Sequence, residues 1–220
     1  MARIAIIIPG LNEARSIAAV VSSVKPLAEW VIVVDDGSTD NTRQLAQDAG
    51  ALVLTHKINR GQGAALETGD QKAKSLGAEI IVHFDADGQF LASDIAKVCA
   101  PIINGQADIV FGSRFLSDNQ LPWAKAKIIM PLAKTLSRLI WNIKLTDPQS
   151  GFRAFNRKVA DTLTIENDRM AHCSEIIIKA HRNKYRVQEV PITVIYHRFG
   201  QNFGGGLRII KDLIYKAITK

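Results

Sequence analysis

The sequence contains no uninterrupted apolar run of about 18 residues, the length that a helix needs to cross a membrane, so no transmembrane helix is expected. It also lacks the series of basic segment, apolar segment and small-residue cleavage site that marks a secretory signal. Cysteine is scarce, and the two residues Cys99 and Cys173 stand far apart and fit no metal-ligand spacing. Two reduced thiols in packing positions suit the cytosol, so a cytoplasmic protein is expected.

Acidic residues are in the minority, with 21 Asp and Glu against 28 Lys and Arg, and the formal net charge is +7. An excess of basic residues suits nucleic acid, an anionic membrane surface or phosphate-bearing substrates. No nucleic-acid-binding module is recognisable, and aromatic and basic residues do not alternate on the expected strands. The charge therefore indicates phosphate-bearing ligands and a membrane surface, without nucleic acid.

The length of 220 residues and the hydrophobic content of 47% suit one folded domain with a sizeable core. Runs of β-branched residues alternate with helical patterns, which predicts an α/β fold whose mostly parallel central sheet carries helices on both faces. Right-handed crossovers place the carboxyl ends of successive strands along one edge of such a sheet. Strands are expected at residues 3–8, 31–34, 51–54, 79–84 and 108–111, with a late strand or strand pair in 186–195. Helices are expected at residues 14–24, 40–49, 62–76, 93–103 and 207–220, with Asp40 and Ser93 as N-caps.

Two carboxylates, Asp85 and Asp87, follow the apolar run at residues 79–82, which is typical of a buried parallel strand. Carboxylates at the C-terminal end of such a strand lie where open α/β sheets bind ligands. The pair can share one hard divalent cation, which takes oxygen ligands and keeps positions open for substrate phosphates. Taken alone, an Asp-x-Asp pattern is equally compatible with two solvated carboxylates in a turn.

Two earlier strands end in similar polar, turn-forming residues. The run at residues 4–8 leads into PGLNE, and the run at residues 31–34 leads into DDGSTDNT. The carboxylates of Glu13 and Asp36 can accept hydrogen bonds from a nucleotide base and from ribose hydroxyl groups. Glu13 can also be an ordinary first-turn residue that complements the dipole of the following helix.

With these motifs in this order, the chain resembles family 2 glycosyltransferases of the GT-A type, and most of all the branch that includes dolichyl-phosphate mannose synthase and bacterial polyprenyl-phosphate sugar transferases. Six motifs carry the resemblance from residue 4 to about residue 155: IPGLNE, VVDDGSTDNT, NRGQGAAL, DADGQF, GSRF and DPQSGFRAF. The resemblance implies a single GT-A domain over residues 1–220. Within it, residues 1–115 would form the nucleotide-sugar-binding half and residues 116–220 the acceptor side.

The resemblance also implies which residues form the site. Those expected to bind the nucleotide sugar are Pro9, Leu11, Asn12, Glu13, Val34, Asp36, Asp85, Ala86, Asp87 and Arg198. Those expected to bind a metal ion are Asp85, Asp87 and Gln89, and Mg²⁺ and Mn²⁺ fit these oxygen ligands equally well. Asp87 and Arg114 are the expected catalytic residues, because a bound cation neutralises the charge that grows on a diphosphate leaving group. The stretch at residues 196–206 departs from the RxxGxSK loop of relatives, since it keeps Arg198 but has no lysine at the expected place.

Arg114 follows the strand expected at residues 108–111, and a guanidinium at a strand end can hold a phosphate through two parallel hydrogen bonds. Asp147 is placed at the boundary of the acceptor side, and Arg153, in the strand-like GFRAF, has a structural role. Glycines in the stretch NRGQG allow close backbone approach, and the helix that follows favours an anion at its N-terminus. A simple glycine turn is the alternative for that stretch.

No dedicated general base is evident, and the QxxRW signature of processive family members is absent. Transfer to a hydroxyl group needs such a base, whereas a phosphate monoester, with a second pKa of about 6, is mostly dianionic at neutral pH. The segment at residues 121–141 is apolar and basic, has tryptophan near each end and contains no acidic residue, which favours a helix lying in a membrane surface. A core helix with a basic solvated face is the alternative. The acceptor phosphate is expected to contact Arg114, Lys125 and Lys127.

These features together predict a metal-dependent, inverting glycosyltransferase that uses a GDP- or UDP-sugar. The expected acceptor is a polyprenyl phosphate. The protein is expected in the cytoplasm, bound peripherally to the cytoplasmic face of the membrane. Two alternatives stay open, namely transfer to a soluble or protein hydroxyl group and a catalytically silent nucleotide-binding module.

Overall fold

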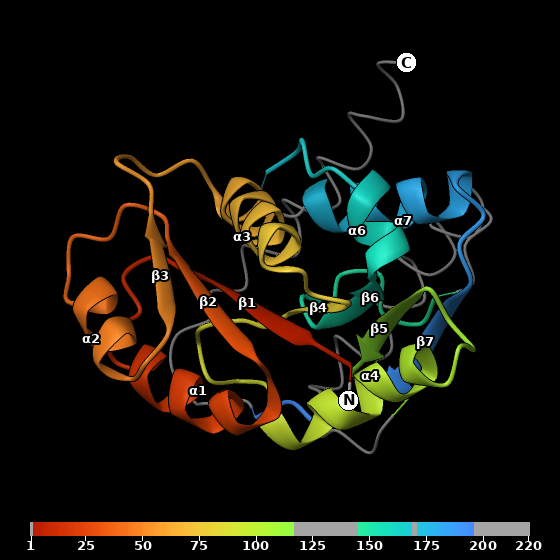
Figure 1. Ribbon diagram of the computed structural model, residues 1–220, viewed down its shortest axis with the longest axis horizontal. Helices are drawn as coiled ribbons and strands as arrows, with labels where there is room; N and C mark the ends of the chain where they lie inside the picture. Colours follow the sequence, from red (N-terminus) through yellow and green to blue (C-terminus); the bar gives the residue numbers. More distant parts are fainter. Residues whose placement is uncertain (1, 117–144, 169–170, 196–220) are drawn as a thin grey trace, which may run out of the picture.

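The computed structural model describes residues 2–116, 145–168 and 171–195 (Figure 1). The strands are β1 (Ile4–Gly10), β2 (Trp30–Asp35), β3 (Leu52–Thr55), β4 (Ile80–His83), β5 (Ile109–Ser113), β6 (Arg153–Asn156) and β7 (Val187–Pro191). The helices are α1 (Ile17–Val24), α2 (Thr42–Asp48), α3 (Gln62–Leu76), α4 (Ile95–Ile103), α6 (Arg157–Thr162) and α7 (Ala171–Arg182), with the 3₁₀ turns η1 (Lys25–Leu27) and η2 (Ala92–Asp94).

The seven described strands form one sheet in the order β3-β2-β1-β4-β6-β5-β7 (Figure 1). Within the described residues, β6 alone runs antiparallel to its neighbours β4 and β5. The mostly parallel α/β sheet confirms the predicted fold class. The carboxyl ends of β1, β2, β4 and β5 consequently face the same edge of the sheet, which is the edge where open α/β sheets bind ligands.

Helices cover both faces of the sheet, as predicted. Helices α1, α2 and α4 pack on one face and α3, α6 and α7 on the other (Figure 1). The reason is visible in β1, where Ile6 and Ile8 belong to one core and Ala5 and Ile7 to the other, all fully buried. A strand that is apolar at every position has to be covered on both sides.

The predicted strands agree with the structure to within about two residues, and the helix predicted at residues 62–76 coincides with α3. The prediction that Ser93 caps a helix is wrong, because Ser93 lies inside η2 and α4 begins after Asp94. The cap of α2 is Asn41 and not Asp40. The Asp40 carboxylate nevertheless accepts a hydrogen bond from the backbone N–H of Thr42 at 3.0 Å. This N–H is one of the donors in the first turn of α2 that have no partner within the helix.

The late strand is confirmed as the edge strand β7, with Pro191 at its end, where a missing N–H breaks no ladder. Arg153 lies on β6 and is fully buried, as expected of a structural residue. Cys99 and Cys173 are both buried and form no disulfide. No helix in the described ranges is long and apolar enough to span a membrane. The segments predicted as helices at 121–141 and 207–220 lie outside the described residues.

Candidate active site

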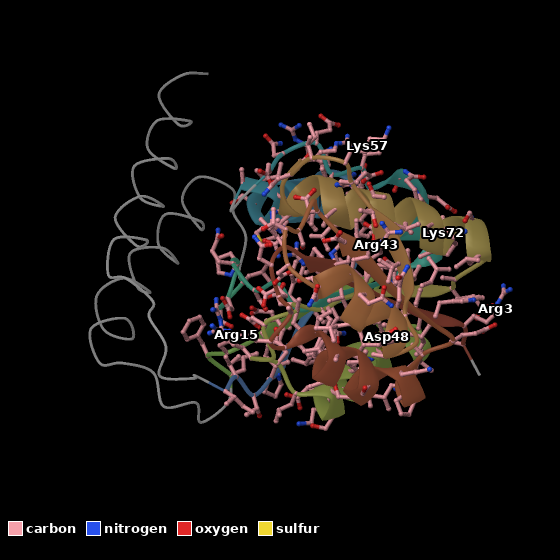
Figure 2. The ribbon with its side chains drawn as sticks, turned by 90° about the vertical axis from the view of Figure 1, so that its left-hand side faces the viewer. Arg3, Arg15, Arg43, Asp48, Lys57 and Lys72 are labelled. Atoms are coloured by element: carbon pink, nitrogen blue, oxygen red, sulfur yellow. The ribbon has the colours of Figure 1, made fainter. Side chains whose placement is uncertain are left out.

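The site predicted from the sequence lies at the carboxyl ends of the strands. Arg3 precedes β1 and Arg15 follows it, and Figure 2 shows these two side chains on opposite sides of the molecule. The Arg15 side is therefore the side to which the parallel strands point. In the ladder between β1 and β2, Gly10 pairs with Asp35, so the loops that follow these two strands start side by side.

The loops after β1 and β2 are joined by hydrogen bonds. The backbone N–H of Asn12 donates to Ser38 Oγ at 2.9 Å, and Asn12 Oδ1 accepts from the backbone N–H of Thr39 at 2.9 Å. The backbone N–H of Glu13 donates to Thr42 Oγ1 at 2.7 Å. Asn12 reaches these partners with a φ of 58°, in the left-handed region that asparagine tolerates better than most residues. The two loops therefore form one connected wall of the site.

The Glu13 carboxylate lies near enough to Asp87 and Asp40 for their charges to act on it. Burial raises its pKa, a hydrogen bond from Ser16 Oγ at 2.9 Å opposes that rise, and the negative charges of Asp87 and Asp40 add to it. An accumulation of negative charge of this kind favours a bound cation or a hydrogen-bond donor such as a sugar hydroxyl group. Contact between Glu13 and a nucleotide sugar stays a prediction.

The apolar residues assigned to the nucleotide differ in exposure. Leu11 is 39% exposed at the end of β1, so its side chain is accessible to a ligand. Pro9 and Val34 are buried, and Val34 packs in the core beneath the sheet end. Ala86 is buried in the opposite core. The contact of these three buried residues with a nucleotide stays a prediction.

Asp36 is 3% exposed and holds a loop in place. Its Oδ1 accepts from the backbone N–H of Arg60 at 2.9 Å and lies 2.6 Å from His56 Nδ1, and its Oδ2 accepts from the backbone N–H of Gly61 at 2.7 Å. His56 is fixed in turn by Thr68 on α3, whose Oγ1 lies 3.0 Å from Nε2. Asp36 thus joins β2 to the loop before α3, and its predicted contact with the nucleotide remains untested.

The N-terminus of α3, for which the NRGQG stretch left an anion site or a glycine turn open, contacts a carboxylate of the chain itself. Asp168 Oδ1 accepts from the backbone N–H of Gly63 at 3.3 Å. A Cβ atom at Gly61 would collide with the same carboxylate, so the close approach requires glycine there. Asp168 is held in place by Glu175, whose carboxylate accepts the backbone N–H groups of residues 166 and 167.

Asp85 and Asp87 follow β4, with Asp85 partly buried and Asp87 exposed. Gln62, the first residue of α3, donates from Nε2 to Asp85 Oδ1 at 3.2 Å, and the backbone N–H of Gln89 donates to Asp87 Oδ1 at 2.9 Å. A Cβ atom added to Gly151 would lie 2.6 Å from Asp85 Oδ2, so the glycine of the SGFR motif makes room for this carboxylate.

Burial, reinforced by the negative charge of Asp87, raises the pKa of Asp85 to about 6. A divalent cation fits this pair of carboxylates, because it would remove the repulsion that the charge of Asp87 exerts on Asp85. Within the described ranges, no group of three His, Cys, Asp or Glu side chains could hold a metal ion. Mg²⁺ and Mn²⁺ take oxygen ligands and can be held by one or two carboxylates, with water and substrate phosphates in the other positions. The Gln89 side chain stays a predicted third ligand.

Arg114 extends from the end of β5 and is bound by Asp147. Its Nε donates to Asp147 Oδ2 at 2.6 Å and one terminal nitrogen donates to Oδ1 at 2.8 Å. The Asp147 side chain is fully buried, whereas that of Arg114 is 30% exposed. The positive charges of Arg153, His172 and Arg114 oppose the rise in the pKa of Asp85, so the Arg114 guanidinium is near enough to Asp85 for their charges to interact. Asp147 fixes the orientation of the arginine, a role that its place in the sequence did not indicate.

The sequence model of glycosyl transferase family 2 matches residues 5–164. The chain belongs to this family. It is 34% identical to UDP-N-acetylglucosamine--dolichyl-phosphate N-acetylglucosaminyltransferase of Methanococcus voltae, in an alignment that covers 97% of this chain and 94% of the relative. It is 29% identical to polyprenol monophosphomannose synthase of Mycolicibacterium smegmatis, covering 98% of this chain and 85% of the relative. The enzyme class predicted from the six motifs is thereby confirmed.

Solved structures confirm the GT-A fold of this family 2 glycosyltransferase. One is glucosyl-3-phosphoglycerate synthase from Mycobacterium tuberculosis in complex with Mn²⁺, uridine diphosphate and glucosyl-3-phosphoglycerate. It matches with a TM-score of 0.74 at 20% identity, covering 98% of this chain and 79% of that structure. The same enzyme has also been crystallised with Mg²⁺ and uridine diphosphate, and matches with a TM-score of 0.75 at 21% identity.

Metal binding by this glycosyltransferase should weaken in acid. Asp85, with a pKa of about 6, is protonated below that pH and must lose its proton to bind a cation. The affinity for Mn²⁺ should therefore be nearly constant above about pH 7 and fall about tenfold per pH unit well below pH 6. Calorimetric titration of the nucleotide-free protein measures this directly. Asp85→Asn should bind weakly at every pH, and an affinity for Mn²⁺ that is unchanged between about pH 5 and pH 7 would contradict the assignment.

Three side chains in hydrogen bonds with the loops at this sheet edge have little or no signal in the sequence: His56, Asp168 and Glu189, whose carboxylate accepts from the backbone N–H groups of residues 146 and 147. His56 directly follows β3, so its position at a strand end is the one local signal available. Asp168 and Glu189 contact residues 105 and 43 positions away, respectively, and no local pattern reveals such contacts. Three predicted site residues, Lys125, Lys127 and Arg198, lie outside the described residues.

Proposed function

We propose that this glycosyltransferase moves one sugar from a GDP- or UDP-sugar to a polyprenyl phosphate at the cytoplasmic face of a membrane, with Mg²⁺ or Mn²⁺ as cofactor. The observation that carries the proposal is the juxtaposition of two unlike groups at one sheet edge. The Asp85–Asp87 pair suits a cation that binds a diphosphate, and Arg114 offers an oriented guanidinium for a second phosphate. The names of the two relatives, a dolichyl-phosphate transferase and a polyprenol phosphate synthase, support the same acceptor class.

In this proposal the nucleoside lies against the loops after β1 and β2, near Leu11, Asn12, Glu13 and Asp36. Residues 1–115 then supply most of the donor site, to which Arg198 adds a contact with the nucleotide sugar. Residues 116–220 supply most of the acceptor side, with Lys125 and Lys127 as further contacts of the acceptor phosphate. Support comes from the exposure of Leu11 and from the partly buried Glu13, whose carboxylate lies close enough to Asp87 for the two charges to interact.

The chemistry requires no protein base when the acceptor is a phosphate. A phosphate monoester is mostly dianionic at neutral pH, and its oxygen can attack the anomeric carbon while the bond to the nucleoside diphosphate breaks on the opposite face. A bound cation would neutralise charge on the departing diphosphate. Arg114, fixed by Asp147, would hold the acceptor phosphate in line for this inverting displacement.

A donor and acceptor panel tests the proposal. The protein is incubated with a GDP- or UDP-sugar as donor, with Mg²⁺ or Mn²⁺ present or absent. The acceptors compared are undecaprenyl phosphate, dolichyl phosphate, 3-phosphoglycerate and a hydroxyl acceptor. Release of nucleoside diphosphate is measured in each case. We expect release that depends on both the metal and a polyprenyl phosphate. Release that depends on 3-phosphoglycerate or on a hydroxyl acceptor, and not on a polyprenyl phosphate, would show that the proposed acceptor class is wrong. Nucleotide binding without release under any condition would favour a catalytically silent nucleotide-binding module.

A membrane surface should bind the segment at residues 121–141, whose basic and aromatic residues are Trp123, Lys125, Lys127, Lys134, Arg138 and Trp141. Each basic residue near an anionic surface contributes about 1 kcal/mol, so the protein should sediment with anionic liposomes and detach as salt rises. Lys125→Ala with Lys127→Ala should reduce binding. Arg43→Ala with Lys57→Ala, which removes two exposed charges elsewhere (Figure 2), should not. Equal binding to neutral and anionic liposomes would contradict the electrostatic argument.

A further inference from the structure

We infer that Glu189, on the edge strand β7, is a positioning residue that orients Arg114 through the loop at residues 145–148 and so sets the affinity for the phosphate acceptor. The inference rests on the proposed role of Arg114 in holding that phosphate. Glu189 itself contacts neither Arg114 nor the Asp85–Asp87 pair in any interaction of the described residues, so it would act through other groups.

The first link is the carboxylate of Asp147, which binds Arg114 in three ways. It accepts from Nε and from a terminal guanidinium nitrogen, and its Oδ2 also accepts from the backbone N–H of Arg114 at 3.1 Å. A bidentate pair of this kind defines the plane of the guanidinium as well as its position. The orientation of Arg114 therefore depends on where the backbone of Asp147 lies.

The second link fixes that backbone. Glu189 Oε1 accepts from the backbone N–H of Asp147 at 2.9 Å, and Oε2 accepts from the backbone N–H of Thr146 at 2.7 Å. The hydroxyl of Thr146 donates to Oε1 at 3.0 Å and lies 2.6 Å from Ser113 Oγ, next to Arg114 in sequence. One carboxylate thus receives three hydrogen bonds from two consecutive residues, and such charge-assisted bonds are stronger than neutral ones.

The geometry of the sheet explains why this carboxylate can reach the loop. In the parallel ladder between β5 and β7, Phe111 pairs with Glu189 and Ser113 pairs with Pro191, so Glu189 stands beside the end of the strand that carries Arg114. Among the ion pairs of the described residues, none includes Glu189. Its charge is directed to the loop and not to a neighbouring cation, which is the arrangement expected of a residue that positions backbone.

Substitution of Glu189 tests the inference with farnesyl phosphate as a water-soluble acceptor. In Glu189→Ala the loop loses three hydrogen bonds, and we expect KM for farnesyl phosphate to rise about tenfold or more. The dissociation constant for the nucleoside diphosphate should change less than about twofold, because the side chain of Glu189 is hydrogen-bonded to residues 146 and 147 and not to the loops after β1 and β2 in the described part of the chain. Glu189→Gln keeps one acceptor oxygen and should show a smaller rise in KM. Gln188→Ala, a change of the preceding residue on the same strand, serves as the matched control and should leave both constants unchanged.

A double-mutant cycle separates positioning from general destabilisation. In the Arg114→Ala background, Glu189→Ala should add almost nothing to the loss of acceptor affinity, because both changes remove the same contact. Additive losses, or an unchanged KM in Glu189→Ala with active wild-type protein, would overturn the inference. If Glu189→Ala does not fold, Glu189→Gln replaces it in the cycle.

A second readout does not depend on turnover. The Nε–H signal of Arg114 in a ¹H–¹⁵N NMR spectrum, assigned with Arg114→Lys, should show slow exchange with water in wild-type protein because Asp147 binds it. In Glu189→Ala that protection should be lost, while the other signals should keep the dispersion of a folded protein. Retained protection of the Arg114 Nε–H would overturn the inference. If the wild-type enzyme transfers sugar to no polyprenyl phosphate, the proposed function alone would be overturned.

Discussion

Replacing Asp87 by alanine should abolish sugar transfer while leaving the fold intact. Asp87 is exposed beyond the end of β4, and its hydrogen bond from the backbone N–H of Gln89 is a short local contact. Unfolding free energy should therefore change by less than about 0.5 kcal/mol. In the proposed mechanism the same carboxylate would hold the cation, which would neutralise charge on the leaving group. This would contribute several kcal/mol, so the rate should fall about a thousandfold or more.

The experiment compares product formation with Mg²⁺ or Mn²⁺ and urea unfolding of the same preparations. Asp48→Ala is the matched control, since Asp48 is an exposed carboxylate at the end of α2 with a single local partner, Gln44, and lies away from the strand ends (Figure 2). It should leave both rate and stability unchanged. Near-normal turnover of Asp87→Ala in the presence of a chelator would show that the metal assignment is wrong.

Among the substitutions considered in this protein, Asp36→Ala should lower the free energy of unfolding the most. The change removes the acceptor of the buried His56 ring and of the partly buried backbone N–H of Arg60, whereas the backbone N–H of Gly61 keeps a second acceptor, Asn59 Oδ1, at 2.9 Å. An unsatisfied buried group costs about 1–3 kcal/mol, so a total of roughly 2–4 kcal/mol is expected. Nucleotide affinity should fall as well, by about 1.5–3 kcal/mol if Asp36 accepts a charged hydrogen bond from the base or ribose.

Urea unfolding and calorimetry with free GDP and UDP measure the two effects separately. Asp36→Asn retains one acceptor oxygen and should lose about half as much stability. Asp35→Ala is a useful control, because Asp35 is equally buried but accepts one backbone N–H, from Ser38 at 3.1 Å. Unchanged affinity for each nucleotide in a folded Asp36→Ala protein would remove Asp36 from the nucleotide site and leave it a purely structural residue.

The layered α/β architecture could be predicted from the sequence because its determinants are local. Strand β1 is apolar at successive positions, so it had to be buried on both faces, and the helix at residues 62–76 is bounded by glycines at both ends. The positions of Asp85 and Asp87 were equally predictable, since carboxylates that directly follow a buried strand have to lie at the sheet edge. The antiparallel strand β6 between β4 and β5 was not predictable, because strand order depends on pairings between distant segments.

What each side chain of the site contacts was decided by the tertiary structure. The sequence left open an anion or a simple glycine turn at the N-terminus of α3, and the fold placed Asp168 there, 105 residues away from Gly63. It predicted a phosphate-binding arginine at the end of β5, and the fold added Asp147 as the carboxylate that orients it. Propensity and periodicity report on residues a few positions apart, whereas these contacts form only when the complete sheet brings its strand ends together.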